Sequence, residues 1–160
     1  MKSIIVVDMQ RGFINKNNEH LINKINTYLN SNKFDNIFYT KFYNNENSPF
    51  VNILKWYDMS NTDEQKFVVY VMPNANIFSK NTYGLNSDNI KTLTKLNINE
   101  IEVCGTDTDA CVLTIAYQLF DSNIKPIILS DLCASSSNDK NIHNNALQIM
   151  ERSFGKECIK

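Results

Sequence analysis

The hydrophobic and polar positions of the chain alternate between two kinds of pattern. Nearly continuous apolar runs at 3–7, 36–40, 101–105 and 125–130 predict buried strands, and residues 77–78 are predicted to end another short strand before Lys80. Between these runs, apolar residues recur at helical spacing over 20–29, 88–96, 111–121 and 139–154, with Ile142, Ala146, Ile149 and Met150 of the last segment facing inward. This alternation predicts an α/β fold, a three-layer α/β/α sandwich whose mainly parallel, Rossmann-like sheet is covered on both faces.

Three further segments carry weaker patterns. Residues 49–59 are predicted to form a helix with Ser48 as N-cap and Pro49 at its first position. The apolar stretch 67–71 is either a short strand or part of a long connection, and 157–159 is predicted to be a last edge strand. Because no repeat, linker or shift in composition interrupts the pattern, we expect residues 1–160 to form a single domain.

Composition excludes several classes of function. The chain has 160 residues, 42% of them hydrophobic, and a net charge of −1, with scattered lysines in place of the basic clusters that nucleic-acid binding needs. Its apolar runs are all shorter than the roughly 18 residues of a membrane span, and the N-terminus lacks a signal-peptide pattern. We therefore expect a cytoplasmic protein that acts on a small molecule, without membrane or nucleic-acid partners.

The four cysteines, Cys104, Cys111, Cys133 and Cys158, form no CxxC pair, and only two histidines are present. In a cytoplasmic chain this pattern predicts four reduced thiols and no metal site.

Three candidate chemical groups follow strand-like segments. Asp8 ends the first run, Lys80 the third, and the loop 105–111 the fourth. Ligands of parallel sheets bind at the carboxyl ends of strands, so these groups are expected to meet there. Asp8 is a candidate general base or a capping residue, since a carboxylate beside a buried strand is costly unless paired. Lys80 is either a solvated surface lysine or a cation that stabilises a thiolate and developing negative charge.

Cys111 is the candidate nucleophile. It lies at the predicted start of a helix just after a strand, where the helix dipole and free N–H groups favour an anion. This position predicts a lowered thiol pKa and a reactive cysteine. The alternative is that Cys111 is a small buried hydrophobic residue, as most free cysteines are.

Four motifs in order resemble those of the isochorismatase-like cysteine hydrolases. They are Ile4-Ile-Val-Val-Asp-Met-Gln10 followed by Gly12-Phe13, Ser79-Lys80 followed by Tyr83, Cys104-Gly-Thr-Asp-Thr-Asp-Ala-Cys-Val112, and Asp131-Leu-Cys-Ala-Ser135 with the later His143. Together they span nearly the whole chain, and the resemblance implies the isochorismatase-like hydrolase fold.

The resemblance implies a triad of Asp8, Lys80 and Cys111. Cys111 would attack an amide-type carbonyl and form a covalent acyl-enzyme, while Asp8 would move the thiol proton to the leaving amine and Lys80 would hold Asp8. A cis peptide bond would join Thr106 to Asp107, and the N–H groups of Asp107 and Cys111 would form an oxyanion hole. Asp107 departs from the small apolar residue usual there, and Asp109 is expected to anchor the loop by hydrogen bonding.

The resemblance also bears on metals and on the substrate pocket. Relatives that hydrolyse nicotinamide carry an aspartate and histidines after the second strand, but the segment 40–49 has no histidine. We therefore expect neither a metal nor an organic cofactor, and structural or exposed roles for His20 and His143. The aromatic residues near the strand ends are expected to line the pocket, with core packing as the alternative: Phe13, Phe42, Trp56 and Tyr83. The run 134–137 is expected to be a flexible polar loop.

The sequence thus predicts a cysteine hydrolase that cleaves an amide or ureido C–N bond in a small molecule. Association into homo-oligomers is an expectation carried by the fold. Three alternatives stay open: thioester hydrolysis or another transfer by the same triad, a non-catalytic small-molecule binder, and a structural interaction protein.

Overall fold

A five-stranded parallel sheet forms the centre of the computed structural model, which describes residues 1–160. Its strands are β1 (Ser3–Val7), β2 (Asn36–Phe42), β3 (Asn76–Lys80), β4 (Glu100–Gly105) and β5 (Lys125–Cys133). They lie in the order β3-β2-β1-β4-β5, and every pairing between them is parallel. All five residues of the central strand β1 are buried, as its continuous apolar run predicts.

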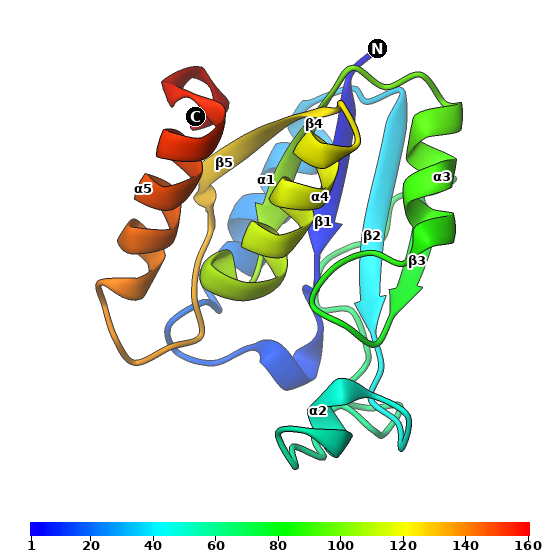
Figure 1. Ribbon diagram of the computed structural model, residues 1–160, viewed down its shortest axis with the longest axis vertical. Coiled ribbons are helices and arrows are strands. Elements are labelled where there is room, and N and C mark those ends of the chain that lie inside the picture. The colour runs from blue at the N-terminus through cyan, green and yellow to red at the C-terminus, as the bar shows by residue number, and fades with distance from the viewer.

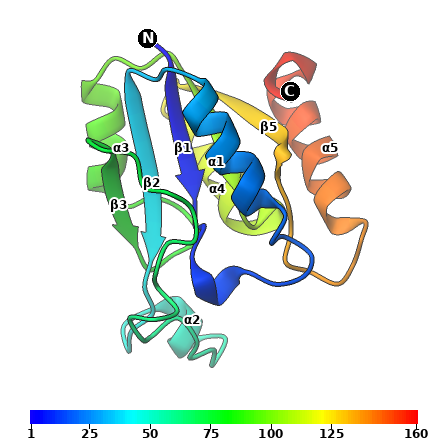
Figure 2. The same cartoon turned by 180° about the vertical axis from the view of Figure 1, so that it is seen from behind.

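Helices cover both faces of this sheet. The helices of the chain are α1 (Leu21–Ser31), α2 (Pro49–Asn52), α3 (Ser87–Lys95), α4 (Leu113–Asp121) and α5 (Ile142–Phe154), of which α2 lies beyond one edge of the sheet. Figure 1 shows α4 in front of the sheet between α5 and α3, and Figure 2 shows α1 on the opposite face. The predicted three-layer α/β/α fold is confirmed. None of the helices is both long and apolar enough to cross a membrane.

The strand order reverses at β1, because the chain first moves outward to β2 and β3 and then returns to β4 on the other side of β1. In open parallel sheets, such a switch point opens a crevice beyond the carboxyl ends of the strands. The arrowheads of β1, β2 and β3 all point toward α2 and its flanking loops, which lie beyond this edge (Figure 1).

The helix predicted over 49–59 is wrong beyond its first turn. Ser48 caps it by accepting a hydrogen bond from the Phe50 N–H at 3.0 Å, but the helix ends at Asn52. The Asn44 side chain instead donates to the carbonyls of Trp56 and Asp58, at 2.9 and 3.0 Å, and so fixes the rest of the segment as a loop. Helical spacing over 49–59 also predicts an apolar stripe of Phe50, Ile53, Leu54 and Tyr57; Phe50 is buried, but the other three are exposed.

Two other segments also differ from expectation. The predicted edge strand 157–159 is a 3-10 turn, Lys156–Cys158, followed by one isolated bridge from Ile159 to Ile128. The stretch 67–71 belongs to a long connection that pairs with the rest of the chain through a single bridge between Phe67 and Gln10. On α5, Ala146 and Met150 are buried as predicted, whereas Ile149 is 48% exposed.

The carboxyl ends of the three central strands are locked together. Gln10, fully buried, donates from Nε2 to the carbonyls of Phe42 and Gln65, both at 2.9 Å, and its Oε1 accepts from the Phe42 N–H at 2.7 Å. On the other side of β1, Gly105 has φ +118°, and a Cβ there would lie 2.2 Å from the Val7 carbonyl oxygen. Only glycine allows this approach of β4 to β1.

We predict that Gln10→Ala lowers the free energy of unfolding by about 2 kcal/mol, because it leaves the buried backbone groups of Phe42 and the partly buried carbonyl of Gln65 without partners. Urea unfolding with an unchanged m value measures this loss. The matched control is Gln148→Ala on the exposed face of α5. Equal stability of the two variants would contradict the assignment.

Candidate active site

Asp8 is the first residue after β1 and has a left-handed backbone, with φ +47°. Its N–H donates to the Thr40 hydroxyl oxygen at 2.9 Å, and that hydroxyl donates back to Asp8 Oδ1 at 2.6 Å. Aspartate tolerates this backbone conformation better than most residues. The turn and the threonine of β2 therefore fix a carboxylate that is 1% exposed.

Lys80 is the last residue of β3, and its Nζ lies 2.7 Å from Asp8 Oδ2 in a fully buried ion pair. The alternative of a solvated surface lysine is wrong. Nζ also donates to the carbonyls of Thr82 and Tyr83, at 3.0 and 3.2 Å. Burial acts to lower the pKa of Lys80, but Asp8 and the sulfur of Cys111 outweigh it, so the pKa is raised and the ammonium stays charged.

Cys111 lies in a π-helical turn, Thr108–Val112, which follows β4 and leads into α4. Its Sγ is 3.4 Å from Lys80 Nζ, so the three candidate residues meet at the switch point. The lowered thiol pKa predicted from the helix start is wrong. Burial, followed by the charge of Asp8, raises the pKa of Cys111 well above its usual value, and the opposing effect of Lys80 does not offset them. Burial and the neighbouring Asp8 therefore disfavour the thiolate form of Cys111.

The turn that carries Cys111 is held by side chains from several elements. The cis peptide bond expected between Thr106 and Asp107 is confirmed. The Asp107 carboxylate accepts hydrogen bonds from the Ser136 N–H and hydroxyl, at 2.7 and 2.6 Å, and from the Thr106 hydroxyl. The buried Asn18 side chain donates to the Thr106 hydroxyl oxygen at 3.1 Å.

Asp107, rather than Asp109, anchors this loop. The expected anchoring role of Asp109 is wrong, because its carboxylate makes no hydrogen bond and its buried Oδ1 has no partner. On the far side of the turn, the Thr108 hydroxyl is hydrogen-bonded to His143 Nδ1 at 2.8 Å. His143 is half-buried and structural, and His20 is exposed.

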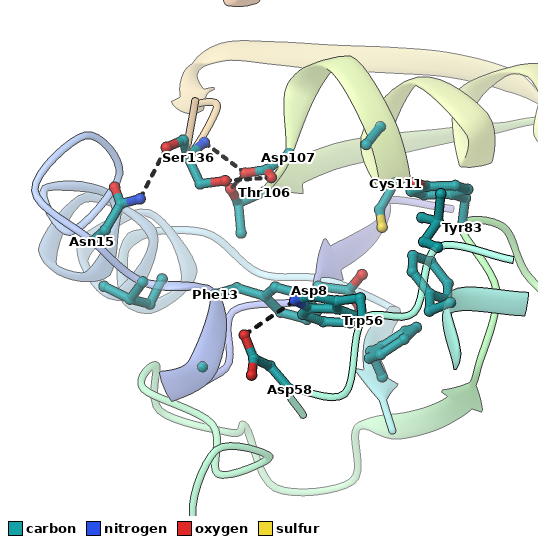
Figure 3. Close-up of a pocket in the computed structure, with 16 residues that line it drawn as sticks. Asp8, Phe13, Asn15, Trp56, Asp58, Tyr83, Thr106, Asp107, Cys111 and Ser136 are labelled. Atoms are coloured by element: carbon teal, nitrogen blue, oxygen red, sulfur yellow. Dashed lines mark hydrogen bonds between the residues drawn. The ribbon is translucent and has the colours of Figure 1, made fainter. Parts of the chain in front are cut away.

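A pocket of about 390 Å³ opens onto Cys111 (Figure 3). The four aromatic residues expected from the sequence all line it, and Trp56 also packs on other rings, so pocket wall and core packing coincide there. Lys80 lies behind Asp8 and Cys111 and does not line the pocket. The complete lining is Asp8, Gly12, Phe13, Ile14, Asn15, Phe42, Phe50, Leu54, Trp56, Asp58, Tyr83, Thr106, Asp107, Ala110, Cys111 and Ser136.

Sequence reasoning missed Phe50, Asn15, Asp58 and Ser136 as pocket residues. Phe50 carried a misleading signal, since its spacing matched a helix stripe. Ser136 belongs to the run 134–137, in which Ala134 and Ser135 are buried and Ser136 binds Asp107, so this part is an ordered wall of the site. Its position after the carboxyl end of β5 was a usable signal. Asn15 and Asp58 carried none.

Comparison with known proteins agrees with this fold. The model of the isochorismatase domain matches residues 2–158, and the chain belongs to the isochorismatase family of hydrolases. No curated protein matches the chain.

Solved structures of the same fold include three hydrolases. An isochorismatase-like hydrolase from Alkaliphilus metalliredigens has TM-score 0.83 and 19% identity, covering 99% of this chain and 94% of that one. A pyrazinamidase of Pyrococcus horikoshii in complex with zinc has TM-score 0.81 and 25% identity, covering 99% and 97%. An N-carbamoylsarcosine amidase from Thermoplasma acidophilum has TM-score 0.75 and 20% identity, covering 94% and 93%.

The zinc of the P. horikoshii protein raises the question of whether this chain could hold a metal. No group of three or more histidine, cysteine, aspartate or glutamate side chains is arranged to bind one. In the segment after β2, the Asn44 amide nitrogen is committed to the carbonyls of Trp56 and Asp58. The donor set of this chain does not fit a zinc site.

We predict that Cys111 titrates above the free-thiol value of about 8.5, because burial and Asp8 disfavour its thiolate. Asp8→Asn removes the neighbouring anion and lowers the thiol pKa, whereas Lys80→Met removes the cation and raises it further. The rate of iodoacetamide alkylation against pH, followed at the Cys111 peptide by mass spectrometry, measures these shifts. Asp88→Asn, a change at an exposed site on α3, is the control and leaves the profile unchanged. A Cys111 that titrates below the free-thiol value would refute this charge assignment.

Proposed function

We propose that this protein hydrolyses an amide or ureido C–N bond of a small molecule, with Cys111 as the nucleophile. The observation that carries the proposal is the buried cluster in which Lys80 Nζ lies 2.7 Å from Asp8 Oδ2 and 3.4 Å from Cys111 Sγ at the base of an open pocket. Nucleophile, base and orienting cation are the parts that covalent acyl transfer requires. The amidases with the same fold support this class of substrate.

In the first half of the reaction, the neutral thiol gives its proton to Asp8 as Sγ attacks the carbonyl carbon. Asp8 suits the role of base because Oδ2, although ion-paired with Lys80, accepts no well-directed hydrogen bond and keeps acceptor capacity. Asp8 then passes the proton that it took from the thiol to the leaving nitrogen as the C–N bond breaks. The product of this half is an acyl group on Cys111 and a free amine or ammonia.

Backbone N–H groups are suited to stabilise the tetrahedral oxyanion. The N–H of Asp107 donates to no acceptor within the protein, and it precedes the turn that carries Cys111. We assign it and the N–H of Cys111 to the oxyanion hole. Fixed donors of this kind are typically among the largest contributions to acyl transfer.

In the second half, water attacks the thioester carbon while Asp8 takes a proton from it. The C–S bond breaks, the carboxylic or carbamic acid leaves, and Asp8 returns the proton to Sγ. Lys80 stays charged throughout, so it orients Asp8 and stabilises the sulfur whenever it carries negative charge.

We predict that ammonia release, measured over a panel of small amides and ureido compounds, identifies at least one substrate of the wild type. Cys111→Ala abolishes this activity, and Asp8→Asn lowers kcat by a factor of about 100 to 10,000, as expected for loss of a general base. The control is Cys158→Ser, because Cys158 is remote from the pocket and donates to the Phe154 carbonyl, which a serine hydroxyl also can.

Intact-mass analysis during turnover is expected to show the acyl group on the wild type and not on Cys111→Ala. Turnover that survives Cys111→Ala would overturn the proposal. If the protein hydrolyses thioesters but no amides, the same triad would serve the alternative reaction, thioester hydrolysis.

A further inference from the structure

The wall of the active-site pocket is acidic. No lysine, arginine or histidine lines it, whereas three carboxylates do: Asp8, Asp58 and Asp107. Asp8 is neutralised by the buried Lys80, but Asp58 and Asp107 take part in no ion pair. With these acids ionised, the pocket therefore keeps an excess of negative charge outside the catalytic cluster.

The two unpaired carboxylates are fixed in place on different parts of the wall. Asp58 Oδ2 accepts from the Trp56 indole N–H at 3.1 Å, and Asp107 is held by Ser136 and the Thr106 hydroxyl. Figure 3 shows Asp58 beside Trp56, and Asp107 beside Thr106 on the other side of the opening. A ligand in this pocket is exposed to carboxylates from both sides.

Five aromatic residues contribute to the remaining wall. Phe13 and Trp56 are stacked with centroids 6.2 Å apart and an angle of 19° between planes, and Phe13 meets Phe42 edge to face at 5.5 Å. Phe50 and Tyr83 extend the same surface, with centroids 4.8 Å apart. Ring faces attract cations, and an indole whose N–H donates to a carboxylate presents a more electron-rich face.

We propose that the pocket selects substrates carrying a positively charged nitrogen, an ammonium or methylated ammonium group, away from the bond that is cleaved. The cation lies against Trp56 and its neighbouring rings, with Asp58 and Asp107 supplying the countercharge. An anionic group would face two carboxylates and no cation, and a neutral apolar group would leave both carboxylates unpaired. This inference rests on the proposed function for the reacting end of the substrate, but the cation site stands on the pocket alone.

Binding of three compounds of similar shape tests the charge preference. Choline is cationic, 3,3-dimethylbutan-1-ol is its neutral isostere, and 3,3-dimethylbutanoate is anionic. Trp56 is the only tryptophan of the chain, so its fluorescence reports occupancy of the pocket directly. We expect choline to bind about tenfold more tightly than the alcohol, with the anion weakest. Equal affinity for choline and the alcohol, or a preference for the anion, would overturn the proposal.

Matched variants locate the effect. Asp58→Asn lowers the choline-to-alcohol affinity ratio several-fold, and the side chain it replaces bonds only to Trp56, so folding is preserved. Asp107→Asn is expected to act in the same direction, and if loss of its loop contacts prevents folding, Asp58→Asn decides alone. The control Asp121→Asn, at the exposed end of α4, leaves the ratio unchanged. A ratio that Asp58→Asn does not alter would contradict the cation site.

Pairing these titrations with the amide-hydrolysis assay of the wild type separates this inference from the proposed function. Choline preference in a wild type that hydrolyses no amide would sustain the cation site and remove the proposed reaction. Amide hydrolysis by a wild type without charge preference would do the reverse.

Discussion

The rest of the site depends on one interaction, the buried ion pair between Asp8 and Lys80. It reaches from the end of β1 to the end of β3 across the intervening β2, with 2.7 Å between Oδ2 and Nζ and almost no exposure of either side chain. Either charge alone would cost several kcal/mol in such surroundings. The carboxyl edge of the sheet is accordingly arranged around the pair: Thr40 binds the carboxylate, and the carbonyls of Thr82 and Tyr83 bind the ammonium.

This arrangement explains how a thiol with a raised pKa can act as a nucleophile. Lys80 Nζ lies close to both the Asp8 carboxylate and Cys111 Sγ. When the proton moves from sulfur to carboxylate, the ion pair between Lys80 and Asp8 is replaced by an ion pair between Lys80 and the Cys111 thiolate. The net charge of the three side chains is zero before and after. Burial strongly penalises a lone thiolate, but it penalises this exchange far less. The pocket in front of the cluster is then free to serve recognition, and in the cation site proposed above this role falls to its carboxylates and aromatic rings.

Local pattern was enough to predict the sheet, its flanking helices and the meeting of Asp8, Lys80 and Cys111 at one edge, because parallel strands bring their carboxyl ends together. The errors at the site arise from contacts that side chains make outside their own segment. Asn44 reaches forward to Trp56 and Asp58 and turns a predicted helix into a loop. Ser136 binds Asp107, so Asp107 rather than Asp109 anchors the nucleophile turn. The sign of the pKa shift at Cys111 depends on burial and on Asp8, which helix position alone does not report.

The protonation state of Cys111 in the resting enzyme tests this account most directly. Infrared difference spectroscopy between the wild type and Cys111→Ser at neutral pH isolates the S–H stretching band of this one thiol from those of the three other cysteines. We expect a band from a neutral Cys111 thiol in the wild type, because burial and Asp8 disfavour the thiolate. Absence of that band in the wild type would show a resting thiolate, and it would contradict the role of Asp8 as the base that takes the thiol proton.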